Sequence, residues 1–358
     1  MKVYINGRFL TQKTTGVQRV AREIIFALDN LKSNGLNHGI NFELLVPKDT
    51  NLDEVFELKN IKIKKVGKLK GHFWEQLELP FWANKNLLIN FCNTGPIFKR
   101  NQIVYIHDAA IYSRPIGYSK KFILWYKILF KLISIFSKKI ITVSNFSKKE
   151  LLIYLPNLKE KIEVSYIAAN HIDKIFQDDS ILDENDLSKG NYFFAVSSMH
   201  PNKNFQIIGK VLSQYKNFNG QMVIAGGKNS RVFSNLEFES NQNIKFVGYV
   251  TDEQLKSLYR NARAFIFPSY YEGFGLPPLE AMSVGCPVIA SNAASIPEVC
   301  QSGAIYFNPD DPEDLVECIN KIYHQDVKDL SDNGLKRSKK FNWNKTAEDL
   351  LNVLRGII

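Results

Sequence analysis

Two short apolar runs, separated by a segment rich in glycine and proline, restrict the fold of this sequence more than any other feature. The runs are residues 264–267 and 288–290. Between them, the glycines of 273–275 permit a tight loop, and the prolines at 277–278 favour a helix start because the first helical positions need no backbone donor. Buried runs of this length are typical of strands in a parallel sheet. The sequence therefore predicts a βαβ unit.

The loop and helix start of this unit form an expected phosphate site. At the carboxyl end of a parallel strand, free backbone N–H groups and the positive end of a helix dipole face a ligand. Glu272 in the loop and Glu280 on the helix flank this point. Their carboxylates accept hydrogen bonds from neighbouring sugar hydroxyls, so the pattern describes a nucleotide-sugar site. The alternative is a surface loop whose acidic residues only stabilise the helix dipole.

The segment YEGFGLPPLEAM at 271–282, followed by GCPV at 285–288, resembles the two-glutamate signature of retaining family 4 glycosyltransferases of the bacterial surface-polysaccharide type. The similarity extends through most of the chain. It implies an α/β protein of the GT-B architecture, with two Rossmann-like doubly wound domains facing a central cleft. In that family the first glutamate, here Glu272, holds the donor sugar, and the second, here Glu280, holds the ribose.

The length and the polar stretches predict the domain organisation. A chain of 358 residues allows two domains of roughly 150 residues each. The charged stretch 173–190 is interpreted as a linker, and the last predicted helix is similar to the family helix that returns to the first domain. We therefore predict an acceptor-side Rossmann-like domain at 1–177, a nucleotide-sugar-binding Rossmann-like domain at 178–342, and a returning helix at 343–358.

Two residues of the first half are candidate site residues. Gly16 lies in a stretch similar to the family's first glycine loop, which contacts the donor phosphates and the acceptor; a plain turn before a helix is the alternative. His107 follows the apolar run 103–106, at a strand end where ligands of open α/β sheets gather. A lone histidine is more often structural. Family members carry a histidine at a comparable strand end, beside the donor sugar and the acceptor.

The second half supplies the candidate phosphate and base contacts. Lys203 follows the apolar run 192–196 near a predicted helix start, where an ammonium group suits a phosphate, and the family has a lysine at the matching point. Many relatives carry an arginine where this chain has Ser198. Either Lys203 and backbone N–H groups stabilise more of the leaving-group charge, or another residue supplies the missing positive charge. Tyr249 and Val250 follow another predicted strand and, by the resemblance, face the base, although Tyr249 also suits a core position.

The resemblance thus assigns two sets of residues. The catalytic set is His107, Lys203 and Glu272. The donor-binding set is Gly16, Ser198, Lys203, Tyr249, Val250, Glu272, Gly273, Phe274, Gly275, Leu276 and Glu280.

The positive charge is concentrated in the first half. The formal net charge is +10, yet residues 1–177 hold 28 Lys and Arg against 14 Asp and Glu, whereas residues 178–358 hold 18 against 22. An uneven basic charge indicates an anionic partner. Because no RRM signature and no paired Cys/His finger occurs, we expect an anionic membrane surface as that partner and no nucleic acid.

Residues 118–139 form the most apolar predicted helix, with Lys120, Lys127 and Lys131 near one narrow face. One interpretation is a helix lying in the interface of an anionic membrane. The other, slightly favoured, is a core helix of the first domain, because a helix this apolar usually packs inside. Both interpretations hold if one edge of the helix is exposed.

Other features concern location. No apolar run reaches the roughly 18 residues that span a bilayer. The sequence begins directly in a predicted strand, which leaves no room for a signal peptide, and its four cysteines show no CxxC spacing. We therefore expect a cytoplasmic protein with reduced thiols, peripheral on the inner face of the cytoplasmic membrane where the basic half docks.

The resemblance predicts a retaining glycosyltransferase. It would move a hexose-type sugar from a nucleotide-diphosphate sugar to a glycan or lipid-linked glycan acceptor in cell-surface polysaccharide synthesis. The sequence has no Asp-x-Asp pair for Mg²⁺, so we expect neither a metal nor a cofactor. The alternative, supported by Ser198, is a non-catalytic sugar-nucleotide-binding partner of another transferase. An NAD-dependent enzyme is disfavoured because no GxGxxG is present.

Overall fold

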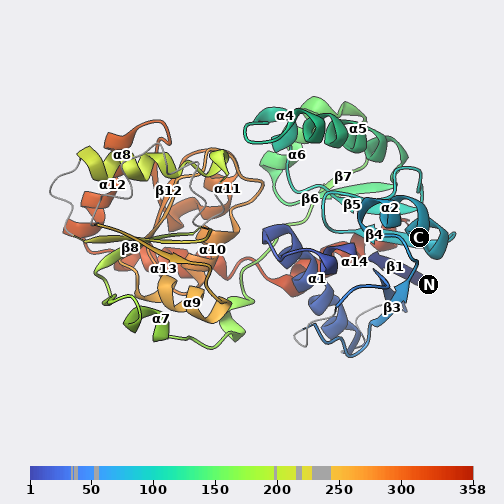
Figure 1. Ribbon diagram of the computed structural model, residues 1–358, viewed down its shortest axis with the longest axis horizontal. Helices are drawn as coiled ribbons and strands as arrows, with labels where there is room; N and C mark the ends of the chain where they lie inside the picture. Colours follow the sequence, from blue (N-terminus) through green and yellow to red (C-terminus); the bar gives the residue numbers. More distant parts are fainter. Residues whose placement is uncertain are drawn as a thin grey trace. The chain divides into compact units, whose positions relative to one another are not determined.

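The computed structural model describes residues 1–33, 35, 39–51, 56–196, 200–214, 220–227 and 243–357. The chain divides into two compact α/β units, one formed by Met1–Ile167 with Trp343–Ile358 and the other by Ala168–Asn342 (Figure 1). None of the helices in the described ranges combines the length and hydropathy needed to cross a membrane.

The first unit therefore ends at Ile167, earlier than the expected boundary at residue 177. The segment after Ile167 is held by the second unit. The ammonium of Lys256 donates hydrogen bonds to the carbonyls of Ile172 and Ile175, at 3.0 and 2.8 Å, and the side chain of Ile172 is buried. The polar stretch that was interpreted as a linker is thus part of the second unit.

The first unit is built on a parallel sheet with the strand order β3-β2-β1-β4-β5-β6-β7. Its strands are β1 (Lys2–Asn6), β2 (Asn41–Pro47), β3 (Lys62–Val66), β4 (Leu87–Asn90), β5 (Gln102–Tyr105), β6 (Lys139–Thr142) and β7 (Ile162–Val164). The central strands are apolar and buried, as expected for a sheet covered on both faces. The strand order reverses between β1 and β4, which is the topological switch point of this sheet.

Helices cover both faces of this sheet (Figure 1). They are η1 (Arg8–Thr11), α1 (Gly16–Ser33), α2 (Gly71–Phe73), η2 (Trp74–Glu78), α3 (Leu79–Ala83), α4 (Ala110–Ser113), α5 (Lys120–Phe136), α6 (Asn145–Tyr154), η3 (Pro156–Leu158) and α14 (Trp343–Ile357). The terminal helix α14 packs against α1, and the hydroxyl of Thr346 donates to the carbonyl of Tyr166 at 2.7 Å.

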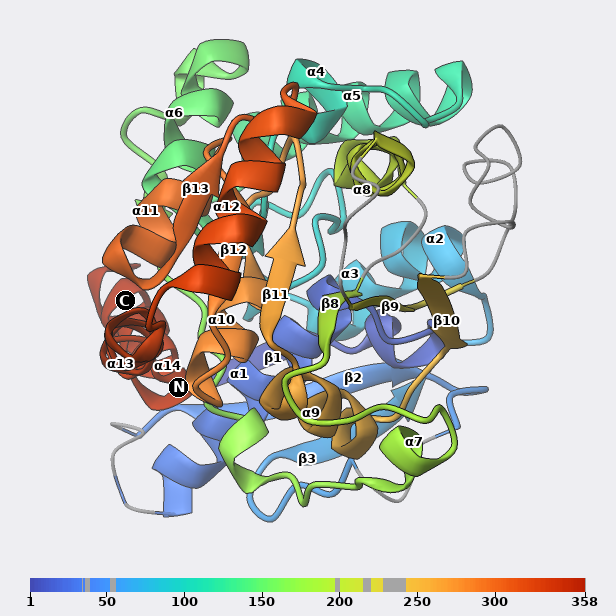
Figure 2. The same cartoon turned by 90° about the vertical axis from the view of Figure 1, so that its left-hand side faces the viewer.

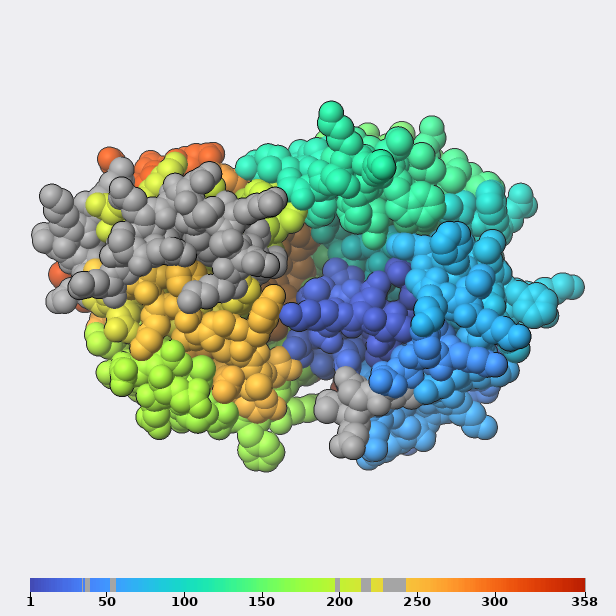
Figure 3. All heavy atoms as spheres, viewed as in Figure 1, coloured from blue at the N-terminus to red at the C-terminus, as the bar shows by residue number. Residues whose placement is uncertain are grey.

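Helix α5 is a core helix of the first unit, the interpretation slightly favoured for residues 118–139. Its inner face, including Leu129, Phe130 and Ile133, is buried in a cluster with β5, β6 and α6. Its outer face exposes Leu124 and Ile128, and side chains from this helix, drawn in green, lie on the surface of the first unit (Figure 3). The helix is thus a core element with one apolar edge exposed.

The second unit has a parallel sheet with the order β10-β9-β8-β11-β12-β13. Its strands are β8 (Tyr192–Val196), β9 (Gln221–Ala225), β10 (Ile244–Gly248), β11 (Ala264–Phe267), β12 (Val288–Ser291) and β13 (Ile305–Phe307). The order reverses between β8 and β11. Ligands of open α/β sheets bind at the carboxyl ends of the strands beside such a reversal, so the loops after β8 and β11 are the expected site.

The helices of the second unit pack on both faces of its sheet, with α8 and α12 on one face and α9 and α10 on the other (Figures 1 and 2). They are η4 (Ile172–Lys174), α7 (Ser180–Asp183), η5 (Pro201–Lys203), α8 (Phe205–Gln214), α9 (Asp252–Asn261), α10 (Leu276–Ser283), α11 (Ile296–Cys300), η6 (Gln301–Gly303), α12 (Pro312–His324) and α13 (Lys328–Ser338). The βαβ unit predicted from the sequence is confirmed as β11, α10 and β12.

Candidate functional site

The loops that follow β8 and β11 bring together two residues predicted from the sequence. Lys203 ends the short η5 helix after β8, and Glu272 lies in the loop after β11. The ammonium of Lys203 lies 2.6 Å from Oε1 of Glu272, and both side chains are partly buried. The backbone N–H of Tyr270 donates to the carbonyl of Asn202 at 2.8 Å and ties the two loops together. The ion pair is therefore held in place at the switch point by the backbone of both loops.

His200 belongs to the same group of residues. Burial lowers the pKa of His200, and the nearby charge of Lys203 lowers it further, against an opposing effect of Glu272. Its Nδ1 accepts a hydrogen bond from the backbone N–H of Asn202 at 3.3 Å. The imidazole thus holds the backbone turn that presents Lys203.

The loop containing Glu272 is fixed by serines from the segment after β12. The hydroxyl of Ser295 donates to the carbonyls of Glu272 and Phe274, at 2.9 Å each, and Ser291 donates to the carbonyl of Ser269 at 2.5 Å. The sequence showed a run of small residues here but not this function. These bonds satisfy three carbonyls of the loop and hold its backbone in place beside the helix start.

Helix α10 begins where the sequence predicted. Gly275 adopts φ 103°, a left-handed conformation that favours glycine, and serves as the N-cap residue before Leu276 and the prolines of the first turn. The side chains of Phe274 and Leu276 are buried, and the ring of Phe274 packs edge-on to Phe341. Those two side chains fill the core, so only their backbone groups are positioned for a ligand.

Glu280 lies in the first two turns of α10 and is buried. Its Oε1 is 3.2 Å from Nε2 of His171, and its Oε2 accepts a hydrogen bond from the hydroxyl of Tyr259 at 3.2 Å. His171 is also buried. Neither contact was predicted, because a lone histidine and a lone tyrosine far along the chain carry no signal that they meet a particular carboxylate.

Tyr249 and Val250 follow β10 at the carboxyl edge of the same sheet. The side chain of Tyr249 is exposed, which excludes the core position considered from the sequence. The hydroxyl end of its ring lies against Gly227, where a Cβ atom would be 2.6 Å from the tyrosine oxygen. The glycine therefore permits an aromatic platform beside β9. Ser198 lies outside the described residues.

The remaining predicted residues belong to the first unit. Gly16 is the first residue of α1. His107 is buried just after β5, and its Nε2 lies 2.7 Å from the carbonyl of Phe91. Because a carbonyl only accepts, Nε2 carries the proton, and Nδ1 is the unprotonated nitrogen. Burial lowers the pKa of His107 to about 4, although the bond to Phe91 opposes this shift. His107 is thus a neutral imidazole.

A buried ionic network at the carboxyl ends of β1 and β4 was missed by the sequence reasoning. Oε1 of Glu75 accepts hydrogen bonds from Asn6, Arg8 and Thr94, at 2.8, 3.1 and 2.9 Å, and Oε2 lies 3.3 Å from Nδ1 of His72. Glu75 belongs to the π-helical segment η2. Such segments are frequent at functional sites. This one directs the carboxylate of Glu75 toward the switch point of the first sheet.

The described residues contain no group of three or more His, Cys, Asp or Glu side chains arranged to hold a metal ion. The positive charge at the second switch point comes instead from Lys203 and the start of α10. The residues present thus suit an anionic ligand that also offers hydroxyl groups to Glu272 and Glu280.

Two doubly wound parallel sheets with sites at their switch points define a protein of the GT-B class. Solved structures superpose on nearly the whole chain. Sucrose-phosphate synthase from Thermosynechococcus elongatus superposes with a TM-score of 0.77 at 17% identity, and the match covers 99% of this chain and 98% of that one. The lipopolysaccharide glycosyltransferase WaaG superposes with a TM-score of 0.70 at 14% identity and 99% coverage of both chains.

Residues 177–341 match the family model described as "Glycosyl transferases group 1". The chain is 31% identical over 247 residues to the O-antigen chain mannosyltransferase RfbU of Salmonella typhimurium, covering 67% of this chain and 66% of that protein. It is 30% identical over 236 residues to O-antigen chain mannosyltransferase B of Escherichia coli, covering 61% of each. The matches thus span about two thirds or less of these relatives. The chain belongs to the group 1 glycosyltransferases.

Proposed function

We propose that this protein is a retaining glycosyltransferase that moves a hexose from a nucleoside-diphosphate sugar to a glycan or lipid-linked glycan in cell-surface polysaccharide synthesis. The observation that carries the proposal is the Lys203–Glu272 pair beside the start of α10. One side chain suits the diphosphate and the other the sugar hydroxyls. Mannose is the hexose we favour, because the similar relatives are named O-antigen mannosyltransferases.

In the proposed reaction the leaving diphosphate is stabilised by Lys203, by the backbone N–H groups near Gly275 and Leu276, and by the dipole of α10. The acceptor oxygen forms a bond to the anomeric carbon on the face from which the phosphate oxygen departs. The proton of the acceptor hydroxyl passes to that phosphate oxygen. No metal ion is required in this scheme, since Lys203 and the helix start supply the positive charge.

His107 has the acceptor-side role in this proposal. Its neutral state follows from burial, and the Phe91 carbonyl fixes the ring through Nε2. A neutral, fixed imidazole is suited to orienting hydroxyl groups through its other nitrogen rather than to supplying charge. Glu280, held by His171 and Tyr259, is assigned to the ribose.

The proposal is tested by incubating the purified protein with nucleoside-diphosphate mannose and following nucleoside-diphosphate release in the presence of a chelator. A transferase slowly passes the sugar to water, so release should occur without an acceptor and without added metal. A non-catalytic sugar-nucleotide-binding protein would protect the donor and release nothing. If mannose donors are inert, a panel of other nucleoside-diphosphate hexoses identifies the sugar.

We also place the protein at the inner face of the cytoplasmic membrane, where a lipid-linked acceptor resides. The support is the excess of 28 basic over 14 acidic residues in residues 1–177, together with the exposed apolar edge of α5. Anionic lipid attracts such a surface by roughly 1 kcal/mol for each basic side chain near it. Binding to vesicles that depends on anionic lipid and weakens with salt is the expected result.

A further inference from the structure

The helical segment 71–83 of the first unit exposes a line of large apolar side chains. Phe73, Leu77 and Phe81 recur at every fourth residue and are 74%, 63% and 77% exposed. In a helix this spacing places them on one face. The opposite face, with Trp74 and Leu79, is buried against β1 to β4. We call Phe73, Leu77 and Phe81 the apolar ridge.

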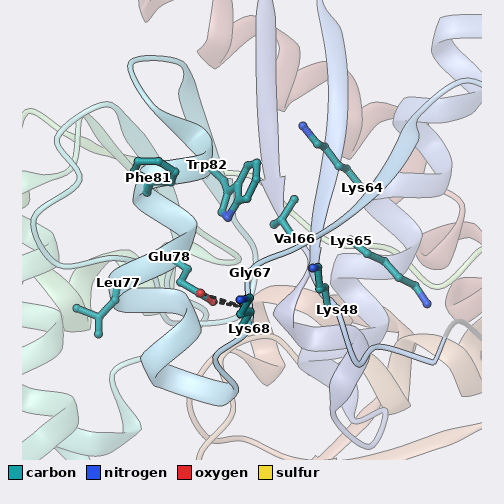
Figure 4. Close-up of a pocket in the computed structure, with 10 residues that line it drawn as sticks. All are labelled: Lys48, Lys64, Lys65, Val66, Gly67, Lys68, Leu77, Glu78, Phe81 and Trp82. Atoms are coloured by element: carbon teal, nitrogen blue, oxygen red, sulfur yellow. Dashed lines mark hydrogen bonds between the residues drawn. The ribbon is translucent and has the colours of Figure 1, made fainter.

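A pocket of about 470 Å³ lies between the ridge and the edge of the first sheet. Figure 4 shows Leu77, Phe81 and Trp82 on the helical side of it, with Lys64 and Lys65 on the side of β3. Lys48 and Lys68 complete its basic lining. We call Lys48, Lys64, Lys65 and Lys68 the lysine pocket.

The one carboxylate that lines this pocket belongs to Glu78. It accepts hydrogen bonds from the backbone N–H groups of Lys68, at 3.0 and 2.9 Å, and of Leu69, at 2.9 Å. Glu78 is thereby held by the turn that follows β3. Lys64 lies over the ring of Trp82 at 5.3 Å from its centroid. The side chains of Lys64 and Lys65, consecutive residues of β3, point in opposite directions and line different sides of the pocket (Figure 4). The four lysines that line the pocket outnumber its single carboxylate, so it favours an anion.

The basic and apolar surface continues onto α5. The rings of His72 and Trp125 pack edge to face with centroids 6.2 Å apart, so the segment 71–83 and α5 are neighbours. Trp125 is exposed, as are Leu124 and Ile128. Soluble proteins rarely expose contiguous apolar patches of this kind unless the patch binds something.

We propose that the apolar ridge enters the interface of an anionic bilayer while the lysine pocket takes the phosphate headgroup of an anionic phospholipid. This inference rests on the membrane docking proposed above and assigns its contact residues. Apolar side chains beside several lysines are the pattern of a helix that lies in a membrane surface. A soluble phosphate would use the lysines but leave the ridge without a function, so charge and exposure together favour a lipid.

The test measures co-sedimentation of the full chain with vesicles of phosphatidylcholine alone or mixed with phosphatidylglycerol. The ridge variant carries Leu77→Ser and Phe81→Ser. Matched controls are Phe176→Ser and Ile153→Ser, because these side chains are 89% and 68% exposed and lie elsewhere. The ridge variant should bind phosphatidylglycerol vesicles at least tenfold more weakly than the wild type, and the controls should bind equally well. Thermal unfolding checks that all four changes leave the fold intact.

The lysine pocket is tested with a variant in which Lys64, Lys65 and Lys68 are changed to Gln. Its matched control changes three exposed lysines of α13 and the residues after it, Lys336, Lys339 and Lys340. The pocket variant should lose most of the preference for phosphatidylglycerol, whereas the control should keep it. If glycerol phosphate binds the wild type in solution and not the pocket variant, while the pocket variant keeps its preference for phosphatidylglycerol vesicles, the pocket is a soluble-phosphate site and the lipid assignment is wrong.

The outcomes separate this inference from the proposals on which it rests. A wild-type protein that ignores vesicles overturns membrane docking itself. A wild type that binds, with ridge and pocket variants that bind equally well, overturns only the assignment to these residues. Concentration-dependent self-association that the ridge variant abolishes would make the ridge an interface between copies of this chain and would also overturn it. Donor hydrolysis measured on the same samples tests the transferase separately.

Discussion

The ammonium of Lys203 lies 2.6 Å from Oε1 of Glu272, although the two residues come from loops after different strands, β8 and β11. A diphosphate bound at the start of α10 would compete with Glu272 for the same ammonium. In the proposed reaction, the pair would hold both side chains at the switch point before a donor binds, which would reduce the ordering that binding requires.

Lys203→Ala should lower donor turnover by on the order of 10², the scale of removing one preorganised group that stabilises developing negative charge. The matched control is Lys210→Ala, an exposed lysine of α8, which should keep wild-type turnover. Steady-state donor hydrolysis, with unfolding temperature as a check on the fold, gives the answer. Equal turnover in the two variants would contradict the phosphate role of Lys203.

Glu280→Gln and Glu272→Gln should have different effects on nucleotide affinity. A ribose contact exists with or without the sugar, so Glu280→Gln should weaken both the free nucleoside diphosphate and the donor. A lost charged hydrogen bond costs about 1.5–3 kcal/mol. Glu272→Gln should leave nucleoside-diphosphate affinity nearly intact and lower donor turnover. Calorimetry paired with donor kinetics distinguishes the two; equal losses of nucleotide affinity would mean that the division of roles is wrong.

His107 should make the folded protein less stable as the pH falls from about 6.5 toward 4. Its folded-state pKa is lowered to about 4 from an ordinary value of 6.5, so in this range the unfolded chain takes up a proton that the folded chain does not. Protonation thus favours unfolding by up to about 3 kcal/mol at pH 4. In denaturant unfolding between pH 7 and pH 4, the free energy of unfolding should fall less steeply for His107→Gln than for the wild type. The exposed His324→Gln should retain the wild-type slope.

Glu75→Gln should destabilise the first unit by about 3–5 kcal/mol, because it leaves the buried Arg8 without its carboxylate. Burial raises the pKa of Glu75, but the His72 contact, the charge of Arg8 and the hydrogen bond from Asn6 together lower it below the ordinary value of 4.5. The charged network thus contributes its full stability above about pH 4.5 and loses it as the pH falls further.

The control for Glu75 is Glu163→Gln, which breaks a partly exposed ion pair with Lys139. Exposed pairs are worth about 0–1 kcal/mol, so this change should have little effect. Denaturant unfolding of both variants at pH 7 measures the difference. A cost for Glu75→Gln no larger than for Glu163→Gln would show that the network does not stabilise the fold.

The sequence predicted elements best where proline and glycine mark their ends. Strands β11 and β12 with α10 between them agree with the expectation because Gly275, the prolines of the first turn and Gly285 set the boundaries. The capping box of Thr251 and Gln254 at the start of α9 is a local signal of the same kind. These signals are local, so a single sequence suffices to read them.

Elements without such signals were missed. The segment 71–83 contains the π-helical stretch η2 and Pro80, which interrupt the ordinary helical period, and no helix was predicted over it. Strand β4 and helix α13 were not identified. The contacts of Glu75 with Asn6 and Arg8 join residues far apart in the chain, and nothing in a single sequence encodes such pairings.

His171 provides the final prediction, because its Nε2 lies 3.2 Å from Oε1 of the proposed ribose ligand Glu280. His171→Ala should weaken nucleoside-diphosphate binding about tenfold or more, the equivalent of a charged hydrogen bond of about 1.5–3 kcal/mol. Turnover at saturating donor should change little, since His171 orients Glu280 and touches no reacting atom. His171→Gln, which restores a donor group, should recover part of the affinity, and the exposed His324→Ala should leave it unchanged. Calorimetry and donor kinetics are the measurements. A fall in unfolding temperature with unchanged nucleotide affinity would mean that His171 only fills space behind α10.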